Sequence, residues 1–413
     1  MSAPQPHPFL VVLQLCANVS PRPSNTVKMM ALFPLLRFIN AFTFVKIGKL
    51  QAAKCKKILI APLDWGLGHT TRCVPVMRYL QGLGLQPVFA GNDWQRRFID
   101  KTFNNIETIH IDGYNVRYGE RNSGFLYSIL LQVPRIFRTI HAEHRWLMEL
   151  TERESFAGII SDNRYGLYHP TIPSVIMTHQ LEVQSGMGNT ANKGLQRMHY
   201  RYLQRFDECW VPDVADSPNL SGKLGHPDKL PPNTYYIGLL SQLEAATDEE
   251  KDNSLVILLS GPEPQRSVLS ALLWEQLYHY PGTIHFVEGS IDAETPKDIP
   301  EHIHHYKQLN RTELLPLLSK AGMVICRSGY STLMDLLRLK QKAILIPTPG
   351  QTEQEYLGKH MMGLGIFYCQ GQKNLELSKA LARATHFSYL SSGIGDEGFQ
   401  QHQEVIDRWL TRL

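Results

Sequence analysis

The chain has 413 residues, a formal net charge of +4 at pH 7 and six cysteines. This length accommodates two domains, and so small a charge does not predict nucleic-acid binding. The cysteines form no CxxC pair, which argues against structural zinc and against a disulfide framework and favours a reducing, cytoplasmic compartment.

The first segment of the chain, residues 1–55, lacks clear strand or helix signals. Pro34, Arg37 and Asn40 interrupt its apolar stretch "MMALFPLLRFINAFTFVKIGKL". The uninterrupted runs are therefore shorter than the roughly 18 to 20 apolar residues that a membrane-spanning helix needs. Three interpretations stay open: an interfacial amphipathic segment, a disordered extension, or a start codon placed too far upstream. We treat residues 1–55 as an extension, disordered or mis-started, that carries no functional motif.

From residue 56 to residue 240 the chain alternates short apolar stretches with amphipathic ones. Strands are predicted at 56–62, 85–92, 106–112, 156–163, 173–180, 205–213 and 233–240, and helices at 69–84, 93–103 and 128–151. Short apolar strands separated by helices are typical of a parallel, doubly wound α/β sheet. We expect this segment to form the first Rossmann-like domain.

The polar stretch "SQLEAATDEEKDN", residues 241–253, is predicted to be a linker. The alternation restarts behind it and predicts a second α/β domain at 254–390, so that a cleft separates two tandem Rossmann-like domains. Strands are predicted at 254–262, 283–290, 303–309, 322–329, 342–349 and 366–370, and helices at 311–321, 331–340 and 352–365. The last segment, 391–413, carries an amphipathic helix, for which packing back on the first domain is one option.

The strongest functional motif is "CRSGYSTLMDLL", which follows a predicted strand. The strand delivers Arg327, Ser328 and Gly329 to a turn, and a helix begins at about Ser331. Backbone N–H groups and a small hydroxyl residue at a helix N-terminus favour a phosphate. Asp335 lies about one turn into this helix, where its carboxylate can accept hydrogen bonds from a ribose.

A second motif, "PTPGQTEQEYLGKH", also follows a predicted strand. It offers Gln351, Glu353, Gln354 and Glu355 within one loop. Clustered carboxamides and carboxylates suit a polyhydroxylated ligand, because each can bridge adjacent hydroxyl groups. Together the two motifs predict a nucleotide-sugar site in the second domain.

These motifs resemble those of the MurG-type members of glycosyltransferase family 28, over about residues 56–390. The family pattern C/S-R-S-G-x-x-T-x-x-E reads here as "CRSGYSTLMD", with Asp335 in place of the ribose-binding glutamate. Glu355 replaces the family's second sugar-binding glutamine, which leaves the identity of the sugar open. The resemblance implies the two-domain GT-B fold and a donor site made of Ser260, Gly261, Arg327, Ser328, Gly329, Ser331, Thr332, Asp335, Gln354 and Glu355.

In the first domain, "DWGLGHTTR" is a looser version of the family's G-G-x-G-G-H loop. The resemblance implies that this loop, with Asp64, Gly66 and Gly68, belongs to the acceptor side of the cleft. His179 and Gln180 follow another predicted strand and are further acceptor-side candidates. His69 is the first candidate for the base that deprotonates the acceptor, Asp162 the second, and Asp64 an alternative. The simpler interpretations are a loop hydrogen bond for His69 and an Asx turn for Asp162.

The resemblance implies an inverting hexosyltransferase that uses a nucleotide-diphosphate sugar, with UDP as the expected nucleotide. No DxD pair stands in a convincing loop, so we expect neither a metal nor another cofactor. The acceptor is unidentified: a glycan or a lipid-linked molecule, the latter reached by peripheral contact with the inner face of the cytoplasmic membrane. The aromatic-rich passage 113–137, with Phe125, Leu126, Tyr127, Ile129 and Leu130, either touches such an acceptor or forms ordinary core.

Three alternatives stay open. A nucleotide-sugar 2-epimerase would use the same two domains without an acceptor. A non-catalytic protein would bind the nucleotide sugar and leave it unchanged. An NAD-dependent oxidoreductase would use Gly66, Gly68 and Asp93, but Thr71 stands where a dinucleotide fingerprint needs its third glycine.

Overall fold

The computed structural model describes residues 56–114, 125–182, 189–245 and 250–413, apart from 262, 279, 291, 292, 294, 295 and 297. Residues 125–134 and 189–191 are described by their backbone alone. The extension 1–55, much of the aromatic-rich passage, the side chains of Phe125, Leu126, Tyr127, Ile129 and Leu130, and linker residues 246–249 therefore lie outside the described residues.

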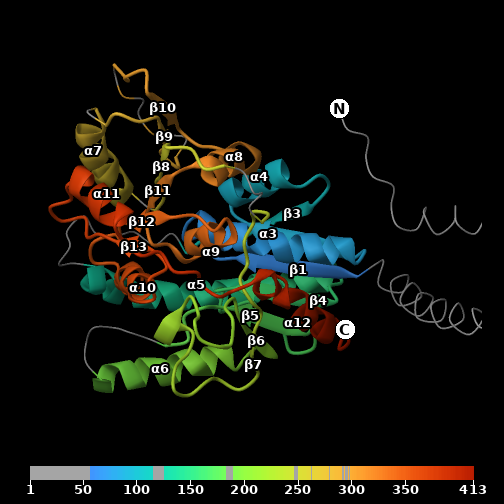
Figure 1. Cartoon of the computed structure of the whole chain (residues 1–413). Coiled ribbons are helices and arrows are strands. Elements are labelled where there is room, and N and C mark those ends of the chain that lie inside the picture. The colour runs from blue at the N-terminus through green and yellow to red at the C-terminus, as the bar shows by residue number, and fades with distance from the viewer. Residues whose placement is uncertain are drawn as a thin grey trace, which may run out of the picture. The chain divides into compact units, whose positions relative to one another are not determined.

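The first sheet consists of seven parallel strands in the order β3-β2-β1-β4-β5-β6-β7 (Figure 1). Its strands are β1 (Lys57–Pro62), β2 (Gln86–Gly91), β3 (Glu107–His110), β4 (Gly158–Asp162), β5 (Ser174–Met177), β6 (Glu208–Val211) and β7 (Thr234–Tyr236). The intervening helices are α3 (Leu67–Gly82), α4 (Asp93–Thr102), α5 (Phe125–Arg153) and α6 (Asn189–Leu203). Because the strand order reverses between β1 and β4, ligands are expected beyond the carboxyl ends of these two strands.

The second sheet consists of six parallel strands in the order β10-β9-β8-β11-β12-β13. Its strands are β8 (Leu255–Leu258), β9 (Ile284–Val287), β10 (Ile303–Tyr306), β11 (Met323–Cys326), β12 (Ala343–Leu345) and β13 (Tyr368–Cys369). The helices of this half are α7 (Gln265–Leu277), α8 (Arg311–Lys320), α9 (Tyr330–Arg338), α10 (Thr352–Gly363), α11 (Leu377–Thr385) and α12 (Gln401–Leu410). The order reverses here between β8 and β11, which marks the equivalent ligand position of this sheet.

The predicted fold class, two parallel α/β sheets in tandem, is confirmed, and every predicted strand is present. Three helices, α6, α7 and α11, were not predicted. In α7 the row Leu269, Leu273 and Leu277 is spaced by four residues, but Leu272 and Trp274 pack on the same core from neighbouring positions. Apolar residues on so much of the helix circumference obscure the helical period in the sequence.

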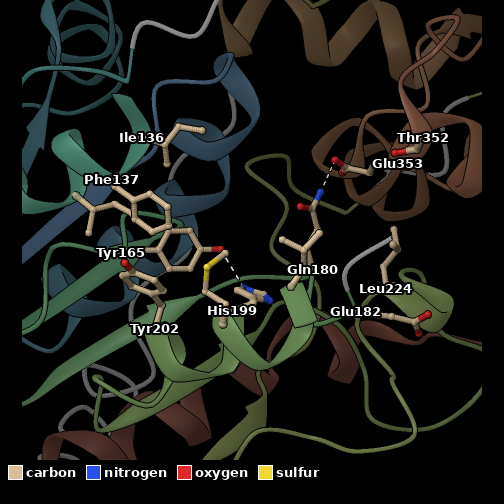
Figure 2. Close-up of a pocket in the computed structure, with 13 residues that line it drawn as sticks. Ile136, Phe137, Tyr165, Gln180, Glu182, His199, Tyr202, Leu224, Thr352 and Glu353 are labelled. Carbon is tan, nitrogen blue, oxygen red and sulfur yellow. Dashed lines mark hydrogen bonds between the residues drawn. The ribbon is translucent and has the colours of Figure 1, made fainter. Parts of the chain in front are cut away.

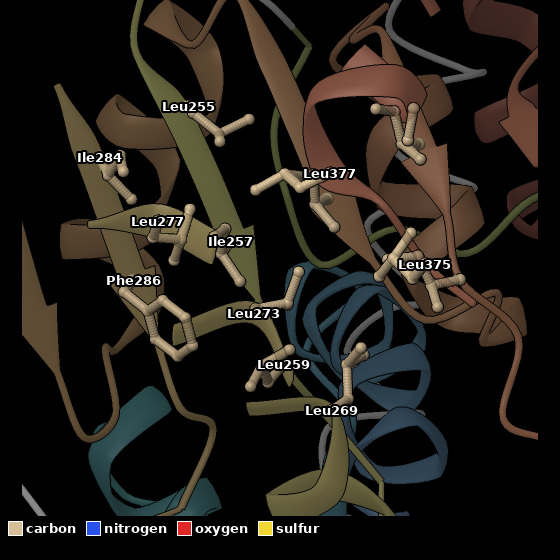
Figure 3. Close-up of a cluster of buried hydrophobic side chains, with 14 of the residues drawn as sticks. Leu255, Ile257, Leu259, Leu269, Leu273, Leu277, Ile284, Phe286, Leu375 and Leu377 are labelled. Carbon is tan, nitrogen blue, oxygen red and sulfur yellow. The ribbon is translucent and has the colours of Figure 1, made fainter. Parts of the chain in front are cut away.

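The core of the second half shows why its strands read as continuous apolar runs. Leu255 and Ile257 of β8 lie beside Ile284 and Phe286 of β9, and α7 covers them with its leucine row (Figure 3). Helices cover both faces of a parallel sheet, so the side chains that point to either face of a strand are apolar.

The C-terminal helix α12 packs against the first sheet. Trp409 is fully buried, and its ring meets Trp210 of β6 edge-on at a centroid distance of 5.5 Å. Arg408 Nη2 lies 2.9 Å from the buried Glu208 carboxylate, also in β6. In the part of the chain that the structure describes, none of the helices has both the length and the apolar character that crossing a membrane requires.

Candidate active site

The carboxyl ends of β1 and β4 bring His69 and Asp162 together. Asp162 ends β4, and His69 lies in the first turn of α3, just after the turn that follows β1. His69 Nδ1 is 3.1 Å from Asp162 Oδ1, although 93 positions separate the two residues. The Asp162 side chain is fully buried, whereas 16% of the His69 side chain is exposed. The carboxylate is thus shielded while the imidazole stays accessible.

Arg72, one turn further along α3, holds the carboxylate in place. Its Nε donates to Asp162 Oδ2 at 2.6 Å, and its Nη2 donates to Asp162 Oδ1. Burial by itself would raise the pKa of Asp162, but Arg72 and His69 outweigh it and lower that pKa to about 2. Burial, followed by the charge of Arg72, lowers the pKa of His69. At neutral pH we therefore expect an ionised Asp162 beside an uncharged imidazole.

The tautomer of His69 decides whether it can act as a base. Its Nδ1 faces an acceptor, Asp162 Oδ1, and also a donor, Arg72 Nη2 at 2.8 Å. When Nδ1 carries the proton it donates to Asp162 and leaves a lone pair on Nε2. In that tautomer His69 can accept a proton at Nε2, and the Asp162 carboxylate stabilises the imidazolium that results.

A chain of polar contacts continues from Arg72 to the second sheet. Arg72 Nη1 lies 3.1 Å from His179 Nδ1, so His179 accepts there and its Nε2–H donates to Glu353 Oε1 at 2.9 Å. Gln180 Nε2 donates to the other oxygen of the same carboxylate. Burial by itself would raise the pKa of Glu353, but the hydrogen bond from His179, together with the charges around it such as Arg72, outweighs burial and lowers that pKa. An ionised carboxylate in the first turn of α10 therefore contacts the end of β5.

The N-terminus of α9 also contacts the first half of the chain. The ring of Tyr330 stacks on His179 at 3.9 Å with an interplanar angle of 6°, and its hydroxyl donates to the Pro212 carbonyl. Ser331 Oγ donates to the Gly68 carbonyl at 2.8 Å. A Cβ atom on Gly68 would lie only 2.8 Å from that hydroxyl. This close approach favours glycine at position 68, because a larger residue would displace the Ser331 hydroxyl.

Several predicted donor residues gather at the carboxyl ends of β8 and β11. Ser260 and Gly261 follow β8, and Gly261 has a φ of +102° with open space where a Cβ atom would stand. Gly329 is the N-cap of α9, and no side chain caps this helix. A Cβ atom on Gly329 would lie 3.7 Å from Thr332 Oγ1. Uncapped backbone N–H groups beside glycines suit an anion such as a diphosphate.

Other predicted donor residues are engaged within the protein. Arg327 is buried, and its guanidinium donates to four protein oxygens, among them the Ile346 and Gln265 carbonyls. Ser328 Oγ donates to the Gln354 carbonyl at 2.7 Å. These contacts make both side chains positioning groups for the loops around β11, and they do not support the predicted phosphate pairing of Arg327.

The two predicted sugar-binding residues also hydrogen-bond to backbone N–H groups of their own loop. Gln354 Oε1 accepts from the backbone N–H of Thr348 at 2.9 Å, and Glu355 Oε1 accepts from that of Gly350 at 2.9 Å. The side chain of this loop that reaches the opposite sheet is instead Glu353. Direct sugar contact by Gln354 or Glu355 would require them to exchange these partners.

Asp335 lies on α9, where its carboxylate meets the start of the linker. It accepts from Ser241 Oγ at 2.6 Å and from Gln242 Nε2 at 3.4 Å. Burial raises the pKa of Asp335 to about 6. On the other side of the site, Asp64 Oδ1 accepts from the backbone N–H of Tyr114 at 3.0 Å, which engages this alternative base in loop structure.

Sequence reasoning did not include Arg72, Tyr330 and Glu353 among the site residues. For Arg72 a signal existed, since positions three apart share a helix face and Arg72 follows His69 by three. Glu353 was noted within the second motif, but its contact with His179, like that of Tyr330, has no local signal, because both residues act on His179 from the other sheet. Within the described ranges, no group of three or more His, Cys, Asp or Glu side chains could hold a metal ion.

A cavity of about 380 Å³ lies beside this network (Figure 2). Residues of α5 and α6, including Phe137 and Tyr202, line one part of it. Gln180 and Glu353, joined by their hydrogen bond, line another part. The cavity therefore reaches the point where the two halves of the chain meet.

Comparisons with known sequences agree with the motifs. Residues 265–387 match the glycosyltransferase family 28 C-terminal domain. An uncharacterized glycosyltransferase of Methanosarcina mazei is 24% identical over 322 residues, which cover 72% of this chain and 81% of the relative. A UDP-N-acetylglucosamine--N-acetylmuramyl-(pentapeptide) pyrophosphoryl-undecaprenol N-acetylglucosamine transferase of Histophilus somni is 22% identical over 340 residues, 79% of this chain and 88% of the relative.

Solved structures are similar in fold. The glycotransferase of kitacinnamycin superposes with a TM-score of 0.61 at 12% identity, over 86% of this chain and 99% of that chain. The spinosyn rhamnosyltransferase SpnG, complexed with thymidine diphosphate, gives a TM-score of 0.52 at 14% identity, over 86% of this chain and 96% of that chain. These neighbours confirm the predicted pair of Rossmann-like domains of the GT-B fold.

Proposed function

We propose that this chain, a MurG-like glycosyltransferase of family 28, transfers a sugar from a UDP-sugar to an acceptor hydroxyl with inversion. The observation that carries the proposal is the His69–Asp162 pair at 3.1 Å. Gly68, the neighbour of His69, accepts a hydrogen bond from Ser331 at the N-terminus of α9. A neutral imidazole thus lies near the helix end to which the family motif assigns the donor diphosphate.

In the proposed step, the acceptor oxygen attacks the anomeric carbon while His69 Nε2 takes the hydroxyl proton. A new C–O bond forms as the bond between the anomeric carbon and the diphosphate oxygen breaks. The electron pair of that bond leaves with UDP, and a single displacement inverts the configuration. Asp162 holds the imidazole by Nδ1 and stabilises its protonated form, a role that commonly contributes about 10²- to 10⁴-fold in rate.

The leaving diphosphate would be stabilised by the first turn of α9 and the glycines around it. Gly261 faces open space, and the backbone N–H groups after Gly329 have no side-chain cap. Such groups can neutralise developing negative charge without a metal ion. We therefore infer that neither a metal nor another cofactor is required.

Three observations support the proposed donor. SpnG is complexed with thymidine diphosphate, which supports a nucleoside-diphosphate donor. The name of the Histophilus somni relative contains UDP-N-acetylglucosamine, which favours uridine. Asp335 stands at the position of the family's ribose ligand, and its carboxylate would exchange Ser241 or Gln242 for a ribose hydroxyl.

We place the reaction in the cytoplasm, with peripheral contact at the inner face of the membrane as an option for a membrane-held acceptor. The described cysteines, Cys73, Cys209, Cys326 and Cys369, are free thiols, which supports a reducing compartment.

Calorimetric titration of the purified chain with UDP, TDP, GDP and NAD tests the donor assignment. We expect UDP to bind most tightly and Asp335→Ala to weaken its binding by tenfold or more. Asp396→Ala is the matched control, because this exposed carboxylate pairs with Arg338, which lies on α9 as Asp335 does. NAD binding without a response to UDP would overturn the proposal.

A second experiment tests the base. We expect His69→Ala to bind UDP as the wild type does and to lose the turnover of UDP-sugars, measured as release of UDP. Full turnover by this variant would remove His69 from the mechanism.

A further inference from the structure

The cavity of about 380 Å³ between α5, α6 and the first turn of α10 has a composition that restricts its ligand. We propose that it binds the acceptor, and that the acceptor is an uncharged, largely apolar alcohol and not a lipid carried on a diphosphate. This inference rests on the proposed function, because it names the substrate class of the same site.

One part of the cavity is apolar and aromatic. Ile136 and Phe137 of α5 face Tyr165 and Tyr202 in Figure 2, and Met198 of α6 completes this wall. The rings of Phe137 and Tyr202 lie 6.1 Å apart. Small-molecule sites are typically lined in this way, with a few polar groups that fix orientation.

The other part is polar, and a relay of side-chain contacts connects it to the proposed base, His69. Glu353 lines the cavity and accepts from His179, which in turn lies 3.1 Å from Arg72. Arg72 contacts both His69 and Asp162. An alcohol whose apolar body lies against α5 and α6 would therefore point its hydroxyl group toward Gln180 and Glu353, the part of the lining that His179 and Arg72 connect to His69.

The charges of the described lining residues disfavour an anionic group. Two carboxylates, Glu182 and Glu353, line the polar part, and no lysine or arginine is among the described residues that line the cavity. Burial lowers the pKa of His199 to about 4, so this imidazole adds no positive charge at neutral pH. A diphosphate placed here would meet like charges in a partly buried setting, where Coulomb repulsion is poorly screened.

The uncharged groups of the lining suit a hydroxyl. Gln180 offers an amide, and Tyr165 Oη lies 3.1 Å from His199 Nε2. The volume falls in the lower part of the range of about 300–1,000 Å³ for small-molecule pockets, which suits one or two rings or a short branched chain.

Geraniol and geranyl diphosphate are a matched pair of probes, since they share one apolar chain and differ in the group at its end. Binding of each to the full chain is measured by calorimetry, with UDP titrated into the same preparation. We expect geraniol to bind at least tenfold more tightly than geranyl diphosphate. Glu353→Gln should narrow that ratio, because it removes one of the two negative charges.

Leu195→Trp tests the location of the site, because Leu195 of α6 lines the cavity and a larger side chain fills it. Arg197→Trp is the matched control: it lies two residues along the same helix, is exposed and does not belong to the lining. We expect only Leu195→Trp to abolish geraniol binding, while both variants keep the wild-type affinity for UDP.

Equal or tighter binding of geranyl diphosphate would overturn the inference, as would geraniol binding that survives Leu195→Trp. Geraniol binding with this pattern in a protein that does not bind UDP would support the cavity assignment and refute the proposed function. A failure of the cavity inference and a failure of the proposed function are thus distinguishable.

Discussion

The hydroxyl of Ser331 donates a hydrogen bond of 2.8 Å to the carbonyl of Gly68, across 263 positions of the chain. Each residue is the second of its helix, Gly68 in α3 and Ser331 in α9. Each helix begins beyond the carboxyl end of a central strand of its own sheet, β1 and β11. The bond therefore joins the position that carries the proposed base to the position that carries the proposed diphosphate site.

Gly68→Ala should disturb this junction. A Cβ atom would lie 2.8 Å from Ser331 Oγ, so the hydroxyl must move and the two helix ends must separate. We expect kcat/KM to fall about tenfold or more, equivalent to at least about 1.4 kcal/mol of transition-state stabilisation. Gly82→Ala at the end of α3 is the control, because nothing lies within 4 Å of a Cβ atom there. Adding Ser331→Gly to Gly68→Ala should restore part of the rate, and a double variant no better than the single one would contradict this explanation.

Asp162→Asn should change both the rate and its pH dependence. The wild-type kcat/KM should fall as the pH drops through the pKa of His69, which lies below the usual 6.5. Asp162 raises that pKa by its charge, so the asparagine variant should show its acid limb at lower pH. Its plateau should fall by about 10²- to 10⁴-fold, since the imidazolium loses its partner. A lower plateau with an unmoved acid limb would indicate a purely structural defect.

The depressed pKa of Asp162 also predicts a loss of stability in acid. Its value falls from 3.8 to about 2 on folding, which corresponds to roughly 2 kcal/mol of stability. Since the folded pKa is the lower one, this contribution is present above about pH 4 and disappears as the pH falls toward 2. Urea unfolding at a series of pH values should show the wild type losing this amount relative to Asp162→Asn. A constant difference between the two proteins would refute the assignment.

Asp335 should contribute a pH dependence of stability opposite in direction to that of Asp162. Its pKa is raised from 3.8 to about 6, so the folded state binds the proton more tightly and wild-type stability is lost as the pH rises through this window. Asparagine cannot ionise, so Asp335→Asn should gain stability relative to the wild type between about pH 4 and pH 7. Thermal melts of the two proteins without ligand, at pH 4 and at pH 7, measure this gain in stability. Titration of Asp335→Asn with UDP should show weaker binding than the wild type. Parallel pH dependence of the two melting temperatures would contradict the raised pKa.

Trp409→Ala should be strongly destabilising. Its indole is fully buried against Trp210, and removal of a buried aromatic ring typically costs about 3–5 kcal/mol. Trp65→Ala is the control, since Trp65 is 39% exposed. Denaturant unfolding should resolve the two, and similar midpoints for both variants would show that α12 contributes little to the fold.

The architecture was largely predictable from the sequence, because parallel strands buried on both faces must be apolar along their whole length. The same reasoning was weaker for α7, where apolar residues occupy too much of the helix surface for a clear period. The turns that follow β1 and β11 were both identified from their glycines. In the turn after β1 the reason is the backbone conformation, since a φ of +93° at Gly66 strongly favours glycine.

By itself the sequence determined two parallel sheets, the helices that begin one or two residues before His69 and Ser331, and the residue types available near each sheet's carboxyl edge. Only the tertiary structure decided which of these residues meet. His69 pairs with Asp162 across 93 positions, and His179 pairs with Glu353 across 174. The structure likewise directs Arg327 and Gln354 to backbone groups of their own half, whereas Glu353, next to Gln354, reaches Gln180 of the first half. Local patterns report burial and turns, whereas these contacts depend on strand order and on the approach of two separately formed sheets, which no local spacing encodes.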